Sequence, residues 1–342
     1  MRAMVMKQIV SLEQCREPLT LADLPIPEPG PGELLVRVVT CGVCHTELDE
    51  IEGRTPPPNL PTVPGHQVVG RVAALGAGTV GFACGQRVGV AWIHSACGVC
   101  HHCLGGNENL CSRFRATGRD VNGGYAEYMT VPAAFAHPVP DVFSDVEAAP
   151  LLCAGAIGYR SIRLAAPVAG KAIGLTGFGA SAHLVLKVLR HLHPDLKVYV
   201  FARNPKERAF ALELGASWAG GSDDAPPQKL ASIIDTTPVW NTVVSALGHL
   251  EPGGRLVINA IRKEDSDKNA LLRLDYPAHL WLEKEIKSVA NVTRADVREF
   301  LVLAAQIPIR PDVEEFPLEE ANRALVELKQ REVRGAKVLR IG

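Results

Sequence analysis

The stretch Lys171-Ala-Ile-Gly-Leu-Thr-Gly-Phe-Gly-Ala-Ser-Ala182 decides the fold class of this 342-residue chain. An apolar run, Lys171–Thr176, ends directly at Gly177-Phe-Gly-Ala-Ser-Ala182, and a helical pattern over Ala180–Arg190 follows. In a G-x-G-x-x-G/A turn the first glycine makes the tight turn, the second lets a pyrophosphate approach the backbone, and the small third residue lets helix and strand pack closely. The stretch therefore predicts a strand, a phosphate-binding turn and a helix, although a purely structural glycine-rich turn also fits the motif alone.

The same alternation of strands and helices continues after this stretch. Three further apolar runs are predicted as strands: Lys197–Phe201, Ala231–Asp235 and, after a turn at Pro252-Gly-Gly, Gly254–Asn259. Two patterns between them are predicted as helices: Pro205–Leu214 and Trp240–Leu250. Such a βαβα series folds into a doubly wound parallel sheet, a Rossmann domain, which holds a dinucleotide pyrophosphate at the first helix N-terminus. The candidate cofactor-binding residues are Gly177, Phe178, Gly179, Ala180, Ala182, Ala202 and Arg203.

The choice of dinucleotide is predicted from the end of the next strand, Val200-Phe-Ala-Arg203-Asn-Pro. An acidic residue there would accept the ribose 2′-hydroxyl of NAD, but this segment has no carboxylate. Arg203 is instead placed to pair with a 2′-phosphate. We therefore expect NADP to be favoured over NAD; the alternative is that Arg203 lies over the adenine.

Residues before this region have a different texture, rich in glycine, proline and short β-type runs. Glu33–Val39 and Gln67–Ala74 predict a partly open β barrel or sandwich, and Met1–Lys7 is typical of an entering strand. Near the C-terminus, a predicted helix over Arg294–Gln306 and a final strand near Lys337–Ile341 indicate a return to this first domain. We therefore expect a catalytic domain of residues 1–153 and 293–342, with a dinucleotide-binding domain of residues 154–292 inserted.

Four cysteines are spaced as Cys97-x2-Cys100-x2-Cys103-x7-Cys111. The two-residue gaps let neighbouring sulfurs converge on one ion, and Zn²⁺ prefers four thiolate ligands in structural sites. Two disulfides or an iron–sulfur cluster are the alternatives, since both would also use only cysteines. The spacing favours a structural zinc site.

Three other segments carry chemistry-bearing residues: Cys41-Gly-Val-Cys44-His-Thr46, Pro64-Gly-His66-Gln67 and Leu152-Cys153-Ala-Gly155. Each cysteine or histidine, taken singly, is more often a buried thiol or a satisfied histidine than a ligand. Together with the four-cysteine segment and in this order, however, they make the chain resemble the zinc-dependent alcohol dehydrogenases of the medium-chain dehydrogenase/reductase family. The resemblance covers essentially the whole chain and implies a GroES-like β-barrel catalytic domain plus a Rossmann domain.

The resemblance also implies the roles of individual residues. Cys44, His66 and Cys153 would bind a catalytic zinc whose fourth position takes water or substrate, and the four clustered cysteines would bind a structural zinc. Three protein ligands leave an open position for a Lewis acid, whereas four thiolates leave none. Thr46 would take the hydroxyl proton of the alcohol, and His45 would face the cofactor pyrophosphate.

Four positions depart from the common family pattern. Glu47 replaces the aspartate that orients the histidine ligand, which puts that hydrogen bond in doubt, and Gln67 replaces a glutamate, which leaves a more positive metal site. Asp49 stands where some relatives end a proton relay in histidine, so proton exit is expected through Asp49, His45 or water. Ile157 replaces a threonine that touches the nicotinamide. None of these changes removes a zinc ligand.

Trp92 falls after a strand where family members place an aromatic residue against the substrate, and Ile51 and Leu110 are further pocket candidates. A tryptophan there would favour primary or aromatic alcohols and aldehydes; the alternative is that Trp92 is a core residue. A polyol or cinnamyl-type alcohol dehydrogenase and a zinc-free NADPH quinone reductase are the alternative activities. His94, His101 and His102 are interpreted as surface residues because four sulfurs already complete the nearby site, and the active site is expected in the cleft between the domains.

Composition limits the partners. The formal net charge is −1, and only Arg113 and Arg115 lie near the cysteine segment, which argues against a nucleic-acid-binding zinc ribbon. No run approaches a membrane span, the N-terminus lacks a signal-peptide core, and nine cysteines suit a reducing compartment, so we expect a cytoplasmic enzyme of small molecules. The resemblance implies a homodimer or homotetramer.

Overall fold

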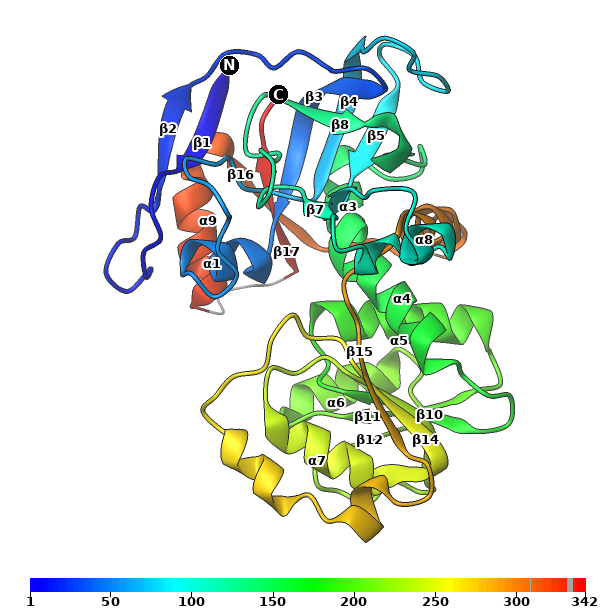
Figure 1. Ribbon diagram of the computed structural model, residues 1–342. Coiled ribbons are helices and arrows are strands. Elements are labelled where there is room, and N and C mark those ends of the chain that lie inside the picture. Colours follow the sequence, from blue (N-terminus) through cyan, green and yellow to red (C-terminus); the bar gives the residue numbers. More distant parts are fainter. Residues whose placement is uncertain (308, 331–334) are drawn as a thin grey trace. The chain divides into compact units, whose positions relative to one another are not determined.

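The computed structural model describes residues 1–307, 309–330 and 335–342. They form two compact units, which we call unit 1 (Met1–Cys153 and Val292–Gly342) and unit 2 (Ala154–Asn291). In Figure 1, unit 1 carries the two ends of the colour bar and unit 2 its green-to-orange middle. Within the described residues no helix is both long and apolar enough to cross a membrane.

A seven-stranded sheet forms the centre of unit 1, in the order β16-β17-β3-β4-β5-β9 with β8 also paired to β3. These strands are β3 (Glu33–Val43), β4 (Val68–Leu75), β5 (Arg87–Val90), β8 (Tyr128–Pro132), β9 (Ala136–Pro138), β16 (Val313–Pro317) and β17 (Ala336–Arg340). All neighbours are antiparallel except β16 and β17. The pairing of β3 with β4 shifts register twice, and such bulges bend a strand as a barrel requires.

The C-terminal segment belongs to this sheet, because Leu339 of β17 pairs with Cys41 of β3. The remaining elements of unit 1 are β1 (Arg2–Met6), β2 (Leu19–Asp23), β6 (Ile93–Ser95), β7 (Arg115–Ala116), α1 (His45–Ile51), α2 (His101–Leu104), α3 (Asp145–Pro150), α8 (Arg294–Gln306) and α9 (Ala321–Lys329), with short turns η1 (Glu108–Leu110), η2 (Ala133–Phe135), η6 (Leu318–Glu320) and most of the π-helical turn η3 (Leu151–Gly155). Helix α8 spans the residues predicted for it and begins with a capping box, in which Thr293 and Asp296 bond reciprocally.

Unit 2 is a six-stranded parallel sheet in the order β12-β11-β10-β13-β14-β15. Its elements are β10 (Ala172–Thr176), β11 (Lys197–Phe201), β12 (Trp218–Gly220), β13 (Leu230–Asp235), β14 (Leu250–Ile258), β15 (Glu285–Ser288), α4 (Ala156–Ala165), α5 (Ala180–Leu192), α6 (Pro205–Glu213), α7 (Trp240–His249), η4 (Lys268–Arg273) and η5 (Tyr276–Leu280). Strands β10 and β13 are almost entirely buried, as a sheet covered on both faces demands. The strand order reverses between β10 and β13, which makes their carboxyl ends the switch point of a Rossmann sheet.

One turn differs from its prediction. Pro252-Gly-Gly lies inside β14 rather than before it, because the strand already begins at Leu250. The register with β13 jumps from Leu250 to Arg255, so the residues between them bulge out of the ladder. The proline lacks a backbone donor, and the bulge removes the need for one.

Candidate active site and metal centres

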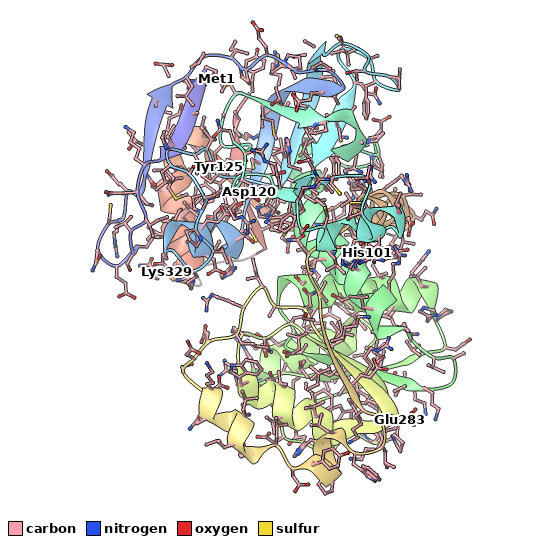
Figure 2. The ribbon with its side chains drawn as sticks, in the orientation of Figure 1. Met1, His101, Asp120, Tyr125, Glu283 and Lys329 are labelled. Carbon is pink, nitrogen blue, oxygen red and sulfur yellow. The ribbon has the colours of Figure 1, made fainter. Side chains whose placement is uncertain are left out.

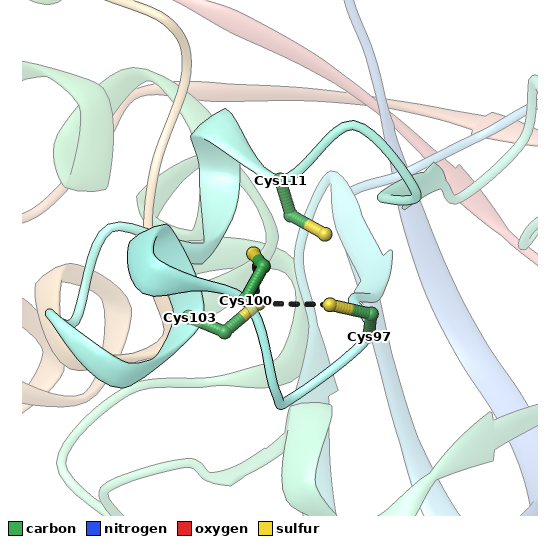
Figure 3. Close-up of side chains that lie close together, drawn as sticks. All are labelled: Cys97, Cys100, Cys103 and Cys111. Atoms are coloured by element: carbon green, nitrogen blue, oxygen red, sulfur yellow. Dashed lines mark hydrogen bonds between the residues drawn. The ribbon is translucent and has the colours of Figure 1, made fainter.

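The four clustered cysteines converge in a lobe of unit 1 formed by residues 95–113 (Figure 3). Their sulfur atoms all lie within 4.8 Å of one another, and the Sγ atom of Cys103 is 3.8 Å from that of Cys97 and 3.6 Å from that of Cys100. These separations are far longer than the roughly 2.05 Å of a disulfide bond, so the two-disulfide alternative does not match the structure. Four convergent sulfurs are the donor set of a closed tetrahedral zinc site.

Hydrogen bonds and burial shift the pKa values of two thiols in the lobe, and a separate ion pair joins the lobe to α8. The backbone amides of Val99 and Cys100 lower the pKa of the Cys97 thiol to about 5, whereas burial raises the pKa of Cys103 to about 12. Outside the cysteines, the backbone N–H and Nε of Arg294 both donate to Glu108 Oε1 at 2.9 Å. This buried carboxylate ties the lobe to the first turn of α8.

A second cluster gathers Cys44, His66 and Cys153 from three separate segments of the chain. Cys44 is the N-cap of α1, His66 lies in the loop before β4, and Cys153 lies on the π-helical turn η3. Their ligand atoms lie within 4.8 Å of one another, with the two Sγ atoms 3.9 Å apart. The structure therefore brings together the three residues that the sequence analysis proposed as one site.

Glu47 holds this cluster in place. Its Oε1 lies 2.6 Å from His66 Nδ1, and its Oε2 accepts the backbone N–H of Cys44 at 2.8 Å. Both carboxylate oxygens are thus used, and the side chain is completely buried. The added methylene of glutamate still reaches the histidine, which answers the doubt raised by this departure from the family pattern.

The donor atoms of this cluster fit a metal ion. His66 Nδ1 is occupied by Glu47, and His66 Nε2 is buried without a hydrogen-bond partner among the residues that the structure describes. Burial lowers the pKa of His66, but Glu47 and the Cys44 thiolate outweigh it and raise that pKa well above its ordinary value. A hydrogen bond from Cys153 lowers the pKa of Cys44 well below its ordinary value. A buried site that favours a thiolate and a positive charge suits a zinc ion held by two sulfurs and one nitrogen.

The neighbours of these donors occupy distinct positions. Thr46 is buried with its Oγ1 3.6 Å from Cys44 Sγ, whereas His45 is exposed at the first turn of α1. Asp49 is buried and paired with Arg54, its Oδ1 2.5 Å from Arg54 Nε. Gln67 is buried, and its amide lies where any side chain at Gly42 would stand.

The proposed pocket residues have different surroundings. Trp92, between β5 and β6, is buried with its ring 5.2 Å from that of Phe114. Ile51 has no exposed surface and lies in the core of unit 1, while Leu110 is 45% exposed on the lobe. His94 was interpreted as a surface residue, which is wrong: its side chain is buried, and burial lowers its pKa.

A buried polar patch beside this cluster was missed by the sequence analysis. Both carboxylate oxygens of Glu50 and the hydroxyl of Tyr125 (labelled in Figure 2) are buried with no hydrogen-bond partner among the described residues. Burial, followed by the charge of Glu47, raises the pKa of Glu50 well above its ordinary value. The three-residue spacing of Glu47 and Glu50 on α1 was the available signal, because residues three apart share a helix face.

The glycine turn of unit 2 has the geometry of a phosphate-binding turn. Gly177 has a φ of 77°, and a side chain there would strike Thr236 and Thr237. Gly179 is the N-cap of α5, and nothing lies within 4 Å of where its Cβ would be. Ala182 is completely buried and Phe178 packs edge-on against Phe210, with ring centroids 5.9 Å apart. Helix α5 begins at Ala180, so the free backbone amides of its first turn lie next to the open space at Gly179. An anion bound in that space would be stabilised by these amides.

At the end of β11, Ala202 is buried and Arg203 is exposed. The guanidinium of Arg208 donates to the backbone carbonyls of both residues, at 2.9 and 3.0 Å. This second arginine, which the sequence analysis did not single out, fixes the turn that presents Arg203. Ile157 is half-buried on α4.

A barrel-like unit with one four-cysteine centre and one centre of two cysteines and a histidine, together with a separate Rossmann unit, defines a medium-chain dehydrogenase. A family model described as the alcohol dehydrogenase GroES-like domain matches residues 30–141. The probable alcohol dehydrogenase AdhA of Mycobacterium tuberculosis (strain CDC 1551 / Oshkosh) is 46% identical over 330 residues, which cover 95% of this chain and 93% of that protein. This chain therefore belongs to the zinc-type medium-chain alcohol dehydrogenase family.

Solved structures agree with this assignment. The crystal structure of an NAD-dependent alcohol dehydrogenase is 25% identical, covers 100% of both chains and gives a TM-score of 0.86. The cobalt- and zinc-bound thermostable alcohol dehydrogenase from Pyrobaculum aerophilum is 26% identical, covers 99% of both chains and gives a TM-score of 0.85. The GroES-like and Rossmann folds expected from the sequence are confirmed.

Proposed function

We propose that this enzyme transfers hydride reversibly between a primary or aromatic alcohol or its aldehyde and NAD(P), with NADP preferred. The observation that carries this proposal is the convergence of Cys44, His66 and Cys153 in a chain that also holds an open glycine turn at a Rossmann switch point. The first supplies an open metal site and the second a dinucleotide site.

Cys44 Sγ, His66 Nε2 and Cys153 Sγ would hold the catalytic zinc. When bound, zinc supplies Lewis acidity that makes an alcohol hydroxyl easier to deprotonate. Glu47 keeps His66 in the orientation that presents Nε2, since its carboxylate holds Nδ1 at 2.6 Å. The sulfurs of Cys97, Cys100, Cys103 and Cys111 would hold a second, structural zinc.

Thr46 is proposed to accept the substrate proton at Oγ1 while it releases its own hydroxyl proton, and its burial next to Cys44 supports this role. His45, exposed at the start of α1, is proposed to face the cofactor and to pass that proton to solvent. Asp49 is a poor proton exit, because Arg54 already holds its carboxylate. His45 or water therefore remains the proposed route.

The NADP preference is proposed from Arg203, an exposed cation at the carboxyl end of β11 with no acid beside it in the segment 200–205. A 2′-phosphate would form charge-assisted hydrogen bonds to its guanidinium. One of the similar solved structures is that of an NAD-dependent enzyme, so the coenzyme preference has to be tested on this chain itself.

The substrate class is proposed from Trp92, whose buried indole N–H has no hydrogen-bond partner among the described residues. Trp92 and Phe114 form an aromatic pair that suits flat, apolar substrates. Ile51 and Leu110 remain weaker proposals, because one lies in the core and the other on the lobe surface. A cinnamyl-type alcohol is included in this class; a polyol is not favoured by an aromatic wall.

A homodimer or homotetramer is also proposed. All four residues of the edge strand β15 are exposed, and Trp281 and Leu282 just before it are about half exposed. An unprotected edge of this kind is a ready surface for pairing. A reducing, cytoplasmic location is proposed from nine cysteines that all remain free thiols.

The test is the initial rate of reduction of a simple aromatic aldehyde by NADPH and by NADH, on metal-replete and chelator-treated protein. We expect turnover that needs the metal and that is faster with NADPH. Faster turnover with NADH would overturn the role of Arg203 alone. Full activity after metal removal would favour a zinc-free quinone reductase, to be checked with a quinone substrate.

A further inference from the structure

The carboxyl edge of the sheet in unit 2 carries a buried amide group that the fold leaves unused. Asn259 follows the last residue of β14, and its side chain is 8% exposed. Its Nδ2 atom is buried and has no hydrogen-bond partner among the residues that the structure describes. A buried amide donor without an acceptor costs roughly 1–3 kcal/mol, so proteins seldom keep one unless a ligand or water completes it.

The backbone holds Asn259 firmly at this edge. Its N–H donates to the carbonyl of Asp235 at 2.7 Å, at the end of the neighbouring strand β13. On the other side, the backbone N–H of Val289 donates to the carbonyl of Ile258 at 3.0 Å. The asparagine is therefore fixed between two strand ends rather than carried on a free loop.

Beside Asn259, the buried ion pair of Lys263 with Asp235 connects the loops after β13 and β14. Lys263 Nζ donates to the buried carboxylate of Asp235, and also to the carbonyls of Thr237 at 2.8 Å and Val239 at 3.2 Å. Thr176 Oγ1, at the end of β10, donates to Asp235 Oδ1 at 2.5 Å. Asp235 and Lys263 use each other as ion-pair partners, and neither bonds to the side-chain Nδ2 of Asn259, which stays without an acceptor among the described residues.

The strand order indicates which part of a dinucleotide reaches this edge. A bound pyrophosphate would lie at the glycine turn after β10, and the adenosine half would lie on the β11 side, where the 2′ position of its ribose is read. The other half would then extend across the switch point to the side of β13 and β14. Asn259 stands there, two strands away from β10.

We propose that the Asn259 side-chain amide donates a hydrogen bond to the nicotinamide half of the bound dinucleotide and positions the ring for hydride transfer. The acceptors on that half are the carboxamide oxygen and the ribose hydroxyls. This inference rests on the proposed function, because it assigns a contact within that dinucleotide site. Asp235 and Lys263 act through it as positioning residues that hold the two loops.

The experiment measures dissociation constants by titration, without turnover, for NADPH, NADH and ADP, which lacks both the nicotinamide and the ribose that carries it. Asn259→Val and Asn259→Ser are compared with Asn269→Val, an exposed asparagine on η4. We expect both Asn259 variants to bind NADPH and NADH about fivefold more weakly, with ADP binding unchanged. Asn269→Val should bind all three ligands like the parent enzyme.

Each other outcome has a definite meaning. Equal weakening for ADP would overturn the proposal, because the residue would then support the site as a whole. Unchanged binding of every ligand in both Asn259 variants would overturn it as well, while leaving the dehydrogenase proposal standing. If the parent chain bound no dinucleotide at all, the proposed function and this inference would both fall. Thermal melting without ligand separates misfolding from a lost contact, and Asn259→Ser is the milder change for that purpose.

Discussion

The two cysteine centres of unit 1 are built in opposite ways. The lobe takes all four sulfurs from a 15-residue segment between Cys97 and Cys111, whereas the other centre takes Cys44, His66 and Cys153 from positions separated by 109 residues at the extremes. The first centre is closed by local chain geometry, and the second exists only when β3, the loop before β4 and η3 are in place. A local site can serve stability, while a site assembled by the whole unit can keep one coordination position open.

The largest expected effect is on the assembled centre. Cys44→Ser should lower kcat/KM by about 10³-fold or more, because the metal's charge stabilisation at the reacting oxygen is worth several kcal/mol. Far-UV circular dichroism should be unchanged, and the metal content should fall by one ion per chain.

Cys84→Ser is the matched control, since Cys84 is an exposed thiol outside both clusters. Substantial residual turnover in Cys44→Ser would contradict the metal mechanism. Loss of both ions would contradict the independence of the two centres.

The local centre should respond in stability instead. Cys103→Ser opens a closed four-sulfur site, so we expect the apparent melting temperature to fall by roughly 10 °C. Scanning calorimetry measures the change, and His102→Asn, a neighbour that is not among the four donors, should melt like the parent. An unchanged melting temperature in Cys103→Ser would show that the lobe carries no structural metal.

Acid should weaken the region beside the lobe. Burial lowers the pKa of His137 to about 4, and Arg298 and Arg294 add to this while Glu108 opposes it. A histidine whose folded pKa lies below its unfolded value keeps its full contribution above about pH 6.5 and loses it as pH falls toward 4. The loss should reach up to about 3 kcal/mol in the free energy of unfolding.

Urea unfolding between pH 7 and pH 4 measures this dependence, and His137→Gln should flatten it. Because the thiolates of both metal centres also take up protons in acid, the relevant quantity is the difference between the parent and the variant. Parallel curves for the two would refute the assignment to His137.

The smallest expected effect concerns the residue that supports the assembled centre. Glu47→Gln keeps the size of the side chain but weakens its bond to His66 Nδ1, so zinc affinity should fall about 10–100-fold. Competition with a chelator measures it. Glu47→Asp, which restores a shorter carboxylate, should recover part of the loss, and an affinity unchanged by Glu47→Gln would mean that the hydrogen bond has no influence on the metal.

Much of this architecture could be predicted because its signals are local. The glycine turn, the strands flanking it and the helix over Arg294–Gln306 all follow from short-range periodicity and breakers. The cysteine spacing similarly predicts convergence. The three-residue cluster could be assigned only through family resemblance, since no local pattern links Cys44 to Cys153.

What the sequence could not predict depends on burial. Histidines near the lobe look alike in sequence, yet His94 is inside and His101 outside. Glu50 and Asn259 read as ordinary polar residues until their surroundings show that atoms of each are buried without a partner among the described residues. Pro252-Gly-Gly has the composition of a turn, but pairing with β13 extends the strand across it.

Cys153 is the last residue of unit 1, and Ala154 is the first of unit 2. Unit 2 is thus an insertion whose upstream seam falls on a proposed metal ligand. Exchanging this inserted unit between relatives could alter coenzyme choice and would leave six of the seven proposed metal donors far along the chain from the junction. The seventh donor, Cys153, would stand directly at the junction. Domain exchange in such enzymes is therefore constrained more at the boundary between Cys153 and Ala154 than at the boundary where the chain re-enters unit 1 at Val292.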